Sequence, residues 1–202
     1  MNSKNALIIM TKNPELGKCK TRLAKTLGDE KALEIYVQLI DYTAKIAKAS
    51  KADLFIYSTD TLVDRKRWES PQTYFSIQSK GDLGQRMSTA IENIKHQGYE
   101  KVIVLGSDCA EINEQDINFA FTQLDSNDFV LGPALDGGYY LIGMKELSPT
   151  LFSNMAWSTA NVLSDSILRI KEKQSSYFLL EAKSDIDFEE DLERKGYVSF
   201  NL

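Results

Sequence analysis

The sequence contains a single histidine and only two cysteines, which leaves few residues for nucleophilic catalysis or for metal binding through sulfur. The two cysteines, Cys19 and Cys109, have neither the spacing of a metal site nor that of a disulfide framework. The histidine, His96, lies in a polar stretch that predicts the last turn of a helix. We therefore expect no Cys/His or Ser/His catalytic pair, and we interpret Cys109 as a small buried packing residue.

Long hydrophobic runs and an excess of basic residues are also lacking. No apolar run approaches the roughly 20 residues of a membrane-spanning helix, and the N-terminal residues show no signal-peptide pattern. The net charge of −5 argues against a protein that coats nucleic acid or a membrane surface. These absences predict a cytoplasmic protein that binds neither nucleic acid nor membrane.

The length of the chain suits one domain of ordinary size, spanning residues 1–202, and its hydrophobic content of 43% is enough for a large core. Short apolar runs predict strands at 6–10, 53–58, 74–78, 101–105, 128–133, 140–144 and 177–180. Helical patterns lie between them, at 29–50, 81–96, from 113 onward, 160–173 and 188–195. Strands that alternate with helices predict an α/β fold with a mainly parallel sheet flanked by helices.

The most informative stretch runs from Val102 to Cys109. Four apolar residues, three of them β-branched, predict a strand that is buried on both faces. Gly106 and Ser107 end the run, and Asp108 follows directly. Open α/β sheets bind their ligands at the carboxyl ends of such strands, so Asp108 is a candidate functional residue. The alternative is that Asp108 only caps the next helix or turn.

A basic loop follows the first predicted strand. It carries Lys12, Lys18, Lys20 and Arg22 against one acidic residue, Glu15. In an acidic protein this local cluster suits a phosphate-bearing ligand, with Lys18, Lys20 and Arg22 as the phosphate-holding side chains. The alternative is an ordinary solvated loop. A P-loop is excluded, because that motif needs Gly at position 12 and Ser or Thr at position 19.

Two further carboxylates, Asp185 and Asp187, lie near the end of the last predicted strand. Two residues apart in an extended segment, they point the same way. If this segment reaches the same sheet edge as Asp108, three carboxylates converge there, and oxygen ligands of this kind favour Mg²⁺ or Mn²⁺. The competing interpretation is that Asp187 is the N-cap of a final helix.

Glycines mark two more candidate regions. Gly81 and Gly84 would allow close approach of a ligand at the start of a helix. The loop between the strands at 128–133 and 140–144 contains Asp136, Gly137 and Gly138, which could contact a sugar or a phosphate, or could form a plain hairpin turn.

Several motifs in this order resemble a known family. They are Lys12-Asn-Pro14 with Gly17-Lys-Cys-Lys-Thr-Arg-Leu23, then Gly106-Ser-Asp-Cys109, Gly132-Pro-Ala-Leu-Asp-Gly-Gly-Tyr-Tyr140, Trp157-Ser-Thr159 and Asp185-Ile-Asp187. Over nearly the whole chain they resemble a bacterial family of glycosyltransferase-like proteins, sometimes labelled selenodomain-associated transferases. That family belongs with the nucleotide-diphospho-sugar transferases of GT-A fold, and phospholactate guanylyltransferase is a characterised relative.

The resemblance implies a GT-A-like, Rossmann-like fold and a transferase that uses a nucleotide-sugar or a nucleoside triphosphate as donor and a small molecule as acceptor. It implies Mg²⁺ or Mn²⁺ bound by Asp108, Asp185 and Asp187, with Asp108, Lys18 and Arg22 as catalytic candidates. Candidate substrate-binding residues are Lys12, Lys18, Lys20, Arg22, Gly84, Arg86, Gly106, Ser107, Gly132, Asp136, Gly137, Gly138, Tyr139, Trp157 and Thr159.

Two departures from the family pattern are visible. Ala110 stands where the family usually has proline, which should change only a turn, and Asn161 stands where an acidic residue is usual.

Both glycosyl transfer and nucleotidyl transfer fit the resemblance. A nucleotide-binding module without catalysis and a protein-binding scaffold are the alternatives from other classes. Three unpaired carboxylates at one edge disfavour the scaffold, because they would repel one another without a cation.

Overall fold

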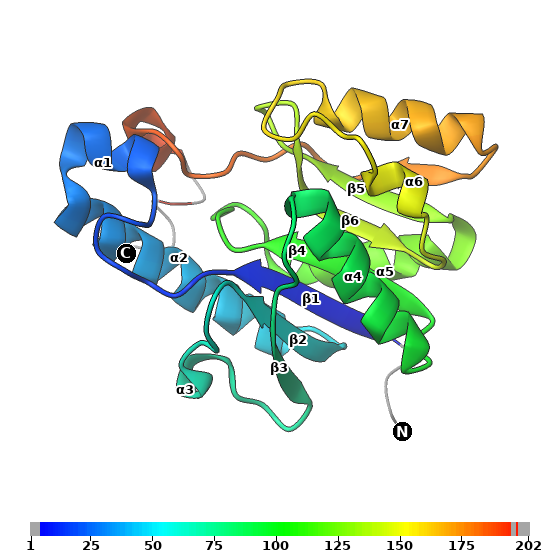
Figure 1. Ribbon diagram of the computed structural model, residues 1–202, viewed down its shortest axis with the longest axis horizontal. Coiled ribbons are helices and arrows are strands. Elements are labelled where there is room, and N and C mark those ends of the chain that lie inside the picture. The colour runs from blue at the N-terminus through cyan, green and yellow to red at the C-terminus, as the bar shows by residue number, and fades with distance from the viewer. Residues whose placement is uncertain (1–4, 195–196, 198–202) are drawn as a thin grey trace.

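The computed structural model describes residues 5–194 and residue 197. Its centre is a seven-stranded sheet with the order β3-β2-β1-β4-β6-β5-β7 (Figure 1). The strands are β1 (Asn5–Thr11), β2 (Asp53–Ser58), β3 (Thr73–Ile77), β4 (Lys101–Gly106), β5 (Phe129–Pro133), β6 (Tyr139–Met144) and β7 (Tyr177–Leu179). The predicted α/β class with a mostly parallel sheet is confirmed.

Strand direction decides which loops meet. β1 pairs in parallel with β2 and β4, and β2 pairs in parallel with β3. β6 runs antiparallel to both β4 and β5, and β7 is parallel to β5. Every strand except β6 therefore ends at the same edge of the sheet, where ligands of open α/β folds bind. The segments that follow these strands are placed side by side at that edge.

Helices cover both faces of the sheet (Figure 1). One face carries α4 (Leu83–His96), α6 (Pro149–Phe152) and α7 (Val162–Glu172). The other carries α2 (Asp29–Ala49), α3 (Arg65–Trp68) and α5 (Glu114–Ser126). The short helix α1 (Thr21–Leu27) packs on α2, beside the 3-10 helix η1 (Glu189–Glu193).

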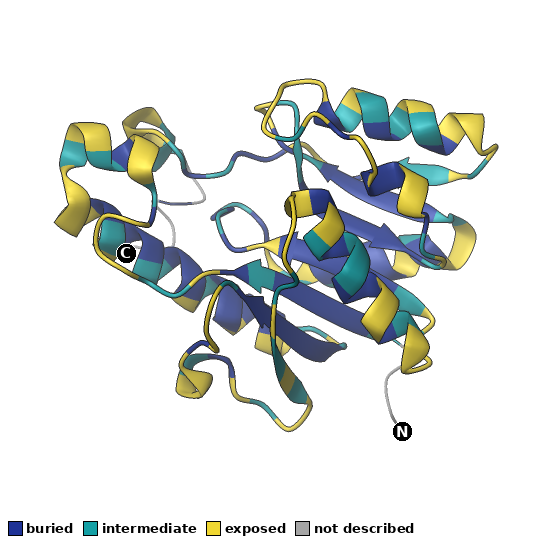
Figure 2. Cartoon of the chain, in the orientation of Figure 1, coloured by how far each residue is buried: buried dark blue, intermediate teal, exposed yellow. Residues whose placement is uncertain are grey.

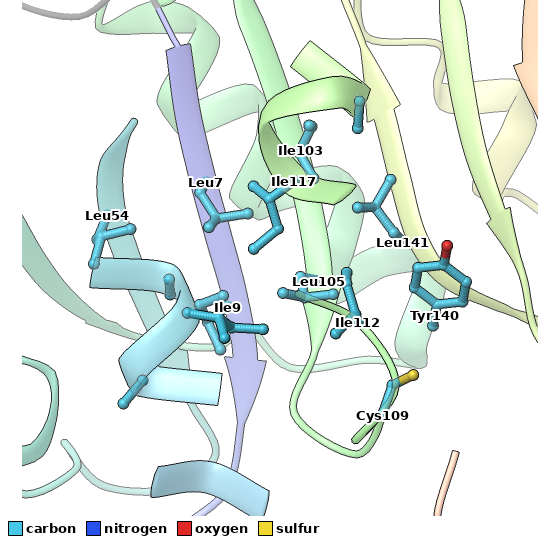
Figure 3. Close-up of a cluster of buried hydrophobic side chains, with 14 of the residues drawn as sticks. Leu7, Ile9, Leu54, Ile103, Leu105, Cys109, Ile112, Ile117, Tyr140 and Leu141 are labelled. Atoms are coloured by element: carbon cyan, nitrogen blue, oxygen red, sulfur yellow. The ribbon is translucent and has the colours of Figure 1, made fainter. Parts of the chain in front are cut away.

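Successive side chains of each central strand point to opposite faces of the sheet, and so they build both layers. On β1, Leu7 and Ile9 face the α2/α5 side, while Ala6 and Ile8 face the α4 side, and all four are fully buried. The five inner strands, β1, β2, β4, β5 and β6, are accordingly almost continuously buried (Figure 2). Figure 3 shows part of the α2/α5-side cluster, which includes Cys109. Cys109 is thus the buried packing residue that the sequence predicted, and burial raises the pKa of its thiol to about 12.

Local signals set several of the helix boundaries. Asp82 and Asn113 cap α4 and α5, and each side chain accepts a hydrogen bond from the backbone N–H three residues later. Helix α2 begins at Asp29, as predicted, directly after Gly28, which has φ of +83°. Helix α7 begins at Val162 after Asn161, two residues later than the predicted range 160–173.

Three short helices, α1, α3 and α6, lie outside the predicted elements. The final predicted helix at 188–195 was also wrong in kind, since η1 is a short 3-10 helix, and residue 195 lies outside the described residues. Across the ranges 5–194 and 197, none of the helices combines the length and apolar character that crossing a lipid bilayer requires.

Candidate functional site

Two pockets adjoin at the carboxyl edge of the sheet, and Lys12 lines both. The larger, which we call the basic pocket, has a volume of about 560 Å³ and is lined by Lys12, Asn13, Glu15, Lys18, Thr59, Asp60, Ile77, Gln78, Ser79, Lys80 and Arg86. The smaller, which we call the carboxylate pocket, has a volume of about 140 Å³ and is lined by Lys12, Cys19, Lys20, Thr21, Arg22, Tyr36, Asp108 and Asp187.

The basic pocket is formed by the segments after β1, β2 and β3 together with the first turns of α4. Four cationic side chains face two acidic ones across it, and one of the cations, Lys18, pairs with Glu15 at 2.6 Å. The Gln78 side chain donates to the carbonyls of Thr11 and Tyr57, at 3.0 and 2.9 Å, and so fixes the loop after β3 against the two neighbouring strands. The pocket is therefore electropositive and anchored to the sheet, which suits a phosphate-bearing ligand.

A hydrogen-bonded group beneath the pockets connects the ends of β1 and β4. The buried Tyr36 hydroxyl, from α2, donates to the carbonyl of Lys12 at 3.1 Å and accepts from the N–H of the same residue at 3.0 Å. Thr11 lies 3.2 Å from this hydroxyl and accepts a hydrogen bond from Ser107. The start of the basic loop and the start of the Asp108 loop are thereby held in one place.

Backbone pairing brings the late carboxylates to Asp108. The chain leaves β7 and crosses toward η1 and α1 (Figure 1). On the way, Asp185 forms an antiparallel bridge with Cys109, and the N–H of Ile186 donates to the Asp108 carbonyl at 3.0 Å. This pairing explains how Asp108 and Asp187 come to line one pocket although they are far apart in sequence.

Glu111 anchors the same crossing segment. Its carboxylate accepts from the N–H of Ser184 at 3.0 Å and from the Arg194 guanidinium at 2.8 Å. Burial opposes ionisation, but these hydrogen bonds outweigh it and hold the pKa of Glu111 below its ordinary value. Lys183 adds an ion pair with Asp116 at 3.2 Å. The position of Asp187 therefore depends on charged contacts several residues away.

Lys20 lies at the centre of the carboxylate pocket. Its side chain is only 4% exposed, and its ammonium lies 3.2 Å from Asp108 Oδ2 and 3.1 Å from Asp187 Oδ1. The two carboxylates are therefore at most about 6.3 Å apart, the sum of these distances. Burial alone would lower the pKa of Lys20, but the charges of Asp108 and Asp187 raise it above 10.5. Arg22 pairs with the other oxygen of Asp187 at 3.0 Å.

This arrangement changes how the basic loop is interpreted. Lys20 and Arg22 were expected to face phosphates, but in the structure both contact carboxylates. Asp187 was a plausible helix cap, but its carboxylate faces Lys20 and Arg22, and Asp191 accepts the N–H groups of residues 187 and 188 instead. Asp185 is the third of these acids. Burial, followed by the charge of Asp108, raises its pKa to about 7.

The donor set suits a divalent cation only in part. In the part of the chain that the structure describes, no three His, Cys, Asp or Glu side chains are arranged to hold a metal ion as they stand. Asp108 and Asp187 nevertheless share one cation, the Lys20 ammonium, and carboxylate oxygens are the ligands that Mg²⁺ and Mn²⁺ prefer. These two residues fit such an ion if Lys20 moves away, and metal binding by them and by Asp185 stays a prediction.

Other predicted residues pack against one another. A Cβ on Gly84 would lie 2.6 Å from Trp157, and one on Gly132 would lie 2.4 Å from the ring of Tyr140. Trp157 in turn contacts Tyr139 edge to face, with ring centroids 6.5 Å apart. The space beside Gly84 and Gly132 is therefore occupied by aromatic side chains of this chain. Thr159 donates to the carbonyl of Ala156, and Gly106 is exposed at the end of β4.

The glycine loop 134–138 connects β5 and β6 as a hairpin. Asp136 accepts from the N–H of Gly138 at 2.9 Å, and the charge of Asp136 contributes to the raised pKa of Asp185. Gly137 has φ of +90° and packs against the backbone of Ala160. Of these two adjacent glycines, only Gly137 therefore has a backbone conformation that residues with a side chain rarely adopt.

Sequence reasoning missed part of the basic pocket, namely Thr59, Asp60, Gln78, Ser79 and Lys80. These residues directly follow β2 and β3. The strand-end rule that singled out Asp108 would have found them, had it been applied to the outer strands as well.

Comparison with known proteins places the chain in a family. It belongs to the family described as an uncharacterized protein conserved in bacteria, DUF2064, whose model matches residues 42–159. No curated protein matches it. Its sequence resemblance to phospholactate guanylyltransferase stays a prediction.

Solved structures share the fold. The chain is 27% identical, with a TM-score of 0.87, to a candidate nucleotide-diphospho-sugar transferase from Desulfovibrio desulfuricans G20, over 98% of this chain and 94% of that one. The inositol-1-phosphate CTP transferase of T. maritima is 13% identical, with a TM-score of 0.59, over 100% and 96%. Rv0371C of Mycobacterium tuberculosis H37Rv in complex with manganese is 12% identical, with a TM-score of 0.54, over 94% and 96%. The chain thus has the fold of nucleotidyl and nucleotide-sugar transferases.

Proposed function

We propose that this protein is a divalent-metal-dependent transferase whose donor is a nucleotide-sugar or a nucleoside triphosphate. One observation carries the proposal: a basic pocket of nucleotide size adjoins a pair of carboxylates from distant segments, at the ligand-binding edge of the sheet. The Desulfovibrio protein of the same fold is named as a candidate nucleotide-diphospho-sugar transferase, and Rv0371C has been seen with manganese. Both are consistent with the proposal.

In this proposal the nucleotide lies in the basic pocket, with Lys12, Lys18 and Arg86 close to its phosphates. Asp108 and Asp187 would hold Mg²⁺ or Mn²⁺, which neutralises charge on the phosphates and on the leaving group when it is bound. The loop at Asp136 and the Tyr139–Trp157 pair lie toward the acceptor side. Tyr36 keeps Lys12 in place through its two hydrogen bonds to that residue.

Product analysis tests the proposal. The purified protein is incubated with Mg²⁺ and single nucleoside triphosphates or nucleotide-sugars, together with phosphorylated and hydroxylated small acceptors. Release of pyrophosphate would identify nucleotidyl transfer, and release of a nucleoside diphosphate would identify glycosyl transfer. A nucleotide that binds tightly but yields no product with any acceptor would favour the alternative, a binding module without catalysis.

A matched pair of variants connects the result to the pocket. Lys12→Ala removes a cation that lines both pockets and should weaken nucleotide binding by about 10- to 100-fold, because a charge-assisted contact contributes roughly 1.5–3 kcal/mol. Lys31→Ala is the control, since Lys31 is exposed on α2 and pairs only with Glu34 in the described structure. Equal nucleotide affinity in the two variants would contradict a phosphate site in the basic pocket.

A further inference from the structure

Lys20 has an unusual position for a lysine in a basic loop. Its backbone is left-handed, with φ of 48° and ψ of 47°, directly before α1. Its ammonium is removed from solvent and lies within 3.2 Å of two carboxylates, although buried lysines are rare unless they are paired in this way. Asp108 and Asp187 belong to segments that are far apart in the sequence and that pair where the N–H of Ile186 donates to the Asp108 carbonyl. Lys20 is therefore the charge that connects three separate parts of the chain.

A divalent ion that bound Asp108 and Asp187 together would need the place that the ammonium now fills. Both positive groups cannot stay there, because they would repel each other at contact distance in a poorly solvated pocket. The cation that the pair needs is thus already present in this chain. Arg22 does not take over this role: of the two carboxylates it pairs with Asp187, and its side chain is 53% exposed.

We propose that Lys20 is the built-in competitor of the metal ion: it holds Asp108 and Asp187 in the free protein and weakens the binding of divalent cations to them. The proposal rests on the assignment of these carboxylates as metal ligands in the proposed function. It gives Lys20 the role of a positioning residue for the carboxylates, in place of the phosphate contact that the sequence suggested. A divalent ion then binds only as Lys20 leaves the pair.

The test measures Mn²⁺ binding to the protein without any nucleotide, by the loss of the electron paramagnetic resonance signal of free Mn²⁺. Lys20→Gln removes the charge but keeps a side chain that can donate hydrogen bonds to the carboxylates. We expect it to bind Mn²⁺ at least 10-fold more tightly than the unmodified protein. Lys20→Arg keeps the charge and should bind Mn²⁺ as weakly as the unmodified protein.

Two additional variants keep the result interpretable. If Lys20→Gln does not fold without metal, Lys20→Met with Mn²⁺ present during refolding gives the same comparison, since the ion should restore the fold. Tight binding in Lys20→Gln should disappear when Asp108→Asn is added, which shows that the ion is held by this pair. A folded Lys20→Gln protein with unchanged or weaker Mn²⁺ affinity would overturn the proposal.

This result is separate from that of the transferase assay, because no nucleotide or turnover enters the binding measurement. Transfer activity together with unchanged Mn²⁺ affinity in Lys20→Gln would leave the proposed function standing and remove the role of Lys20. Tighter Mn²⁺ binding in Lys20→Gln without any transfer product would support the role of Lys20 and contradict the proposed transferase activity.

Discussion

Gly137 shows most clearly how one residue constrains the candidate acceptor loop. Its φ is +90°, and an added Cβ would lie 2.2 Å from the carbonyl oxygen of Ala160. We expect Gly137→Ala to lose at least about 2 kcal/mol of unfolding free energy, because strain in the left-handed region adds to a clash with backbone. Thermal unfolding should show a decrease in Tm of about 4–8 °C for a chain of this length.

Its neighbour Gly138 supplies the control. A Cβ there would meet only Asp136 Oδ1, at 3.2 Å, and φ does not lie in the left-handed region. Gly138→Ala should therefore unfold within a few degrees of the unmodified protein, and any loss of transfer activity in it would report on ligand contact. Equal Tm values for the two variants would contradict the packing described for this loop.

At the residue scale, the sequence indicated which carboxylates could meet but not which side chain pairs with them. The strand-end rule singled out Asp108, Asp185 and Asp187 as acids that would converge if their segments reached one sheet edge, and the structure brings Asp108 and Asp187 around one ammonium. The identity of that cation was not predictable, because Lys20 comes from a loop without regular periodicity. Its side chain could face solvent, phosphate or carboxylate with the same local sequence.

Among the elements, the segment between β7 and η1 forms no helix or strand, yet it carries Asp185 and Asp187. Glu111 holds it through Ser184 and Arg194. We expect Glu111→Gln to lower the unfolding free energy by about 1–2 kcal/mol at pH 7, since it removes a partly buried charged partner. Chemical denaturation of the two proteins measures the difference.

The pH dependence follows from the direction of the shift. The pKa of Glu111 is lower in the folded state than the ordinary 4.5, so its contribution is fully present above about pH 4.5. The contribution is lost as the pH falls through the lowered folded pKa, and the two proteins should then converge. Glu146→Gln is a fair comparison, because Glu146 is 89% exposed and its replacement should change the unfolding free energy little. A difference between Glu111→Gln and the unmodified protein that stays constant down to pH 3 would argue against this anchor.

At the scale of elements, the long helices were predictable from sequence and the short helices were not. The long apolar stripe of α2 and the polar caps of α4 and α5 are local signals. Helices α3 and α6 have four residues each, too few for a periodic pattern to form. The sequence of the final 3-10 helix predicts an α-helix instead, because acidic residues at its start also suit an α-helix.

For the whole molecule, sequence predicted the mainly parallel sheet but not its order. Alternation of strands and helices indicates parallel pairing, whereas the insertion of β6 antiparallel between β4 and β5 depends on contacts between distant segments. That insertion shapes the candidate site. It turns the start of β6, and with it the loop at Asp136, to the edge where β4 and its Asp108 loop end.

The candidate site joins loops that follow β1, β2, β3 and β4 to the segment after β7, so a ligand bound there contacts segments from both ends of the chain. A ligand that binds only the folded state at 100 times its Kd adds about 2.7 kcal/mol of stability. For a chain of 202 residues this corresponds to an increase in Tm of about 5–10 °C. We expect that increase with one class of nucleotide in the presence of Mg²⁺, and a much smaller one in Lys12→Ala. A screen of nucleoside triphosphates and nucleotide-sugars that produces no increase at millimolar concentration would contradict a nucleotide site here. An increase that persists unchanged in Lys12→Ala would place the nucleotide outside the basic pocket.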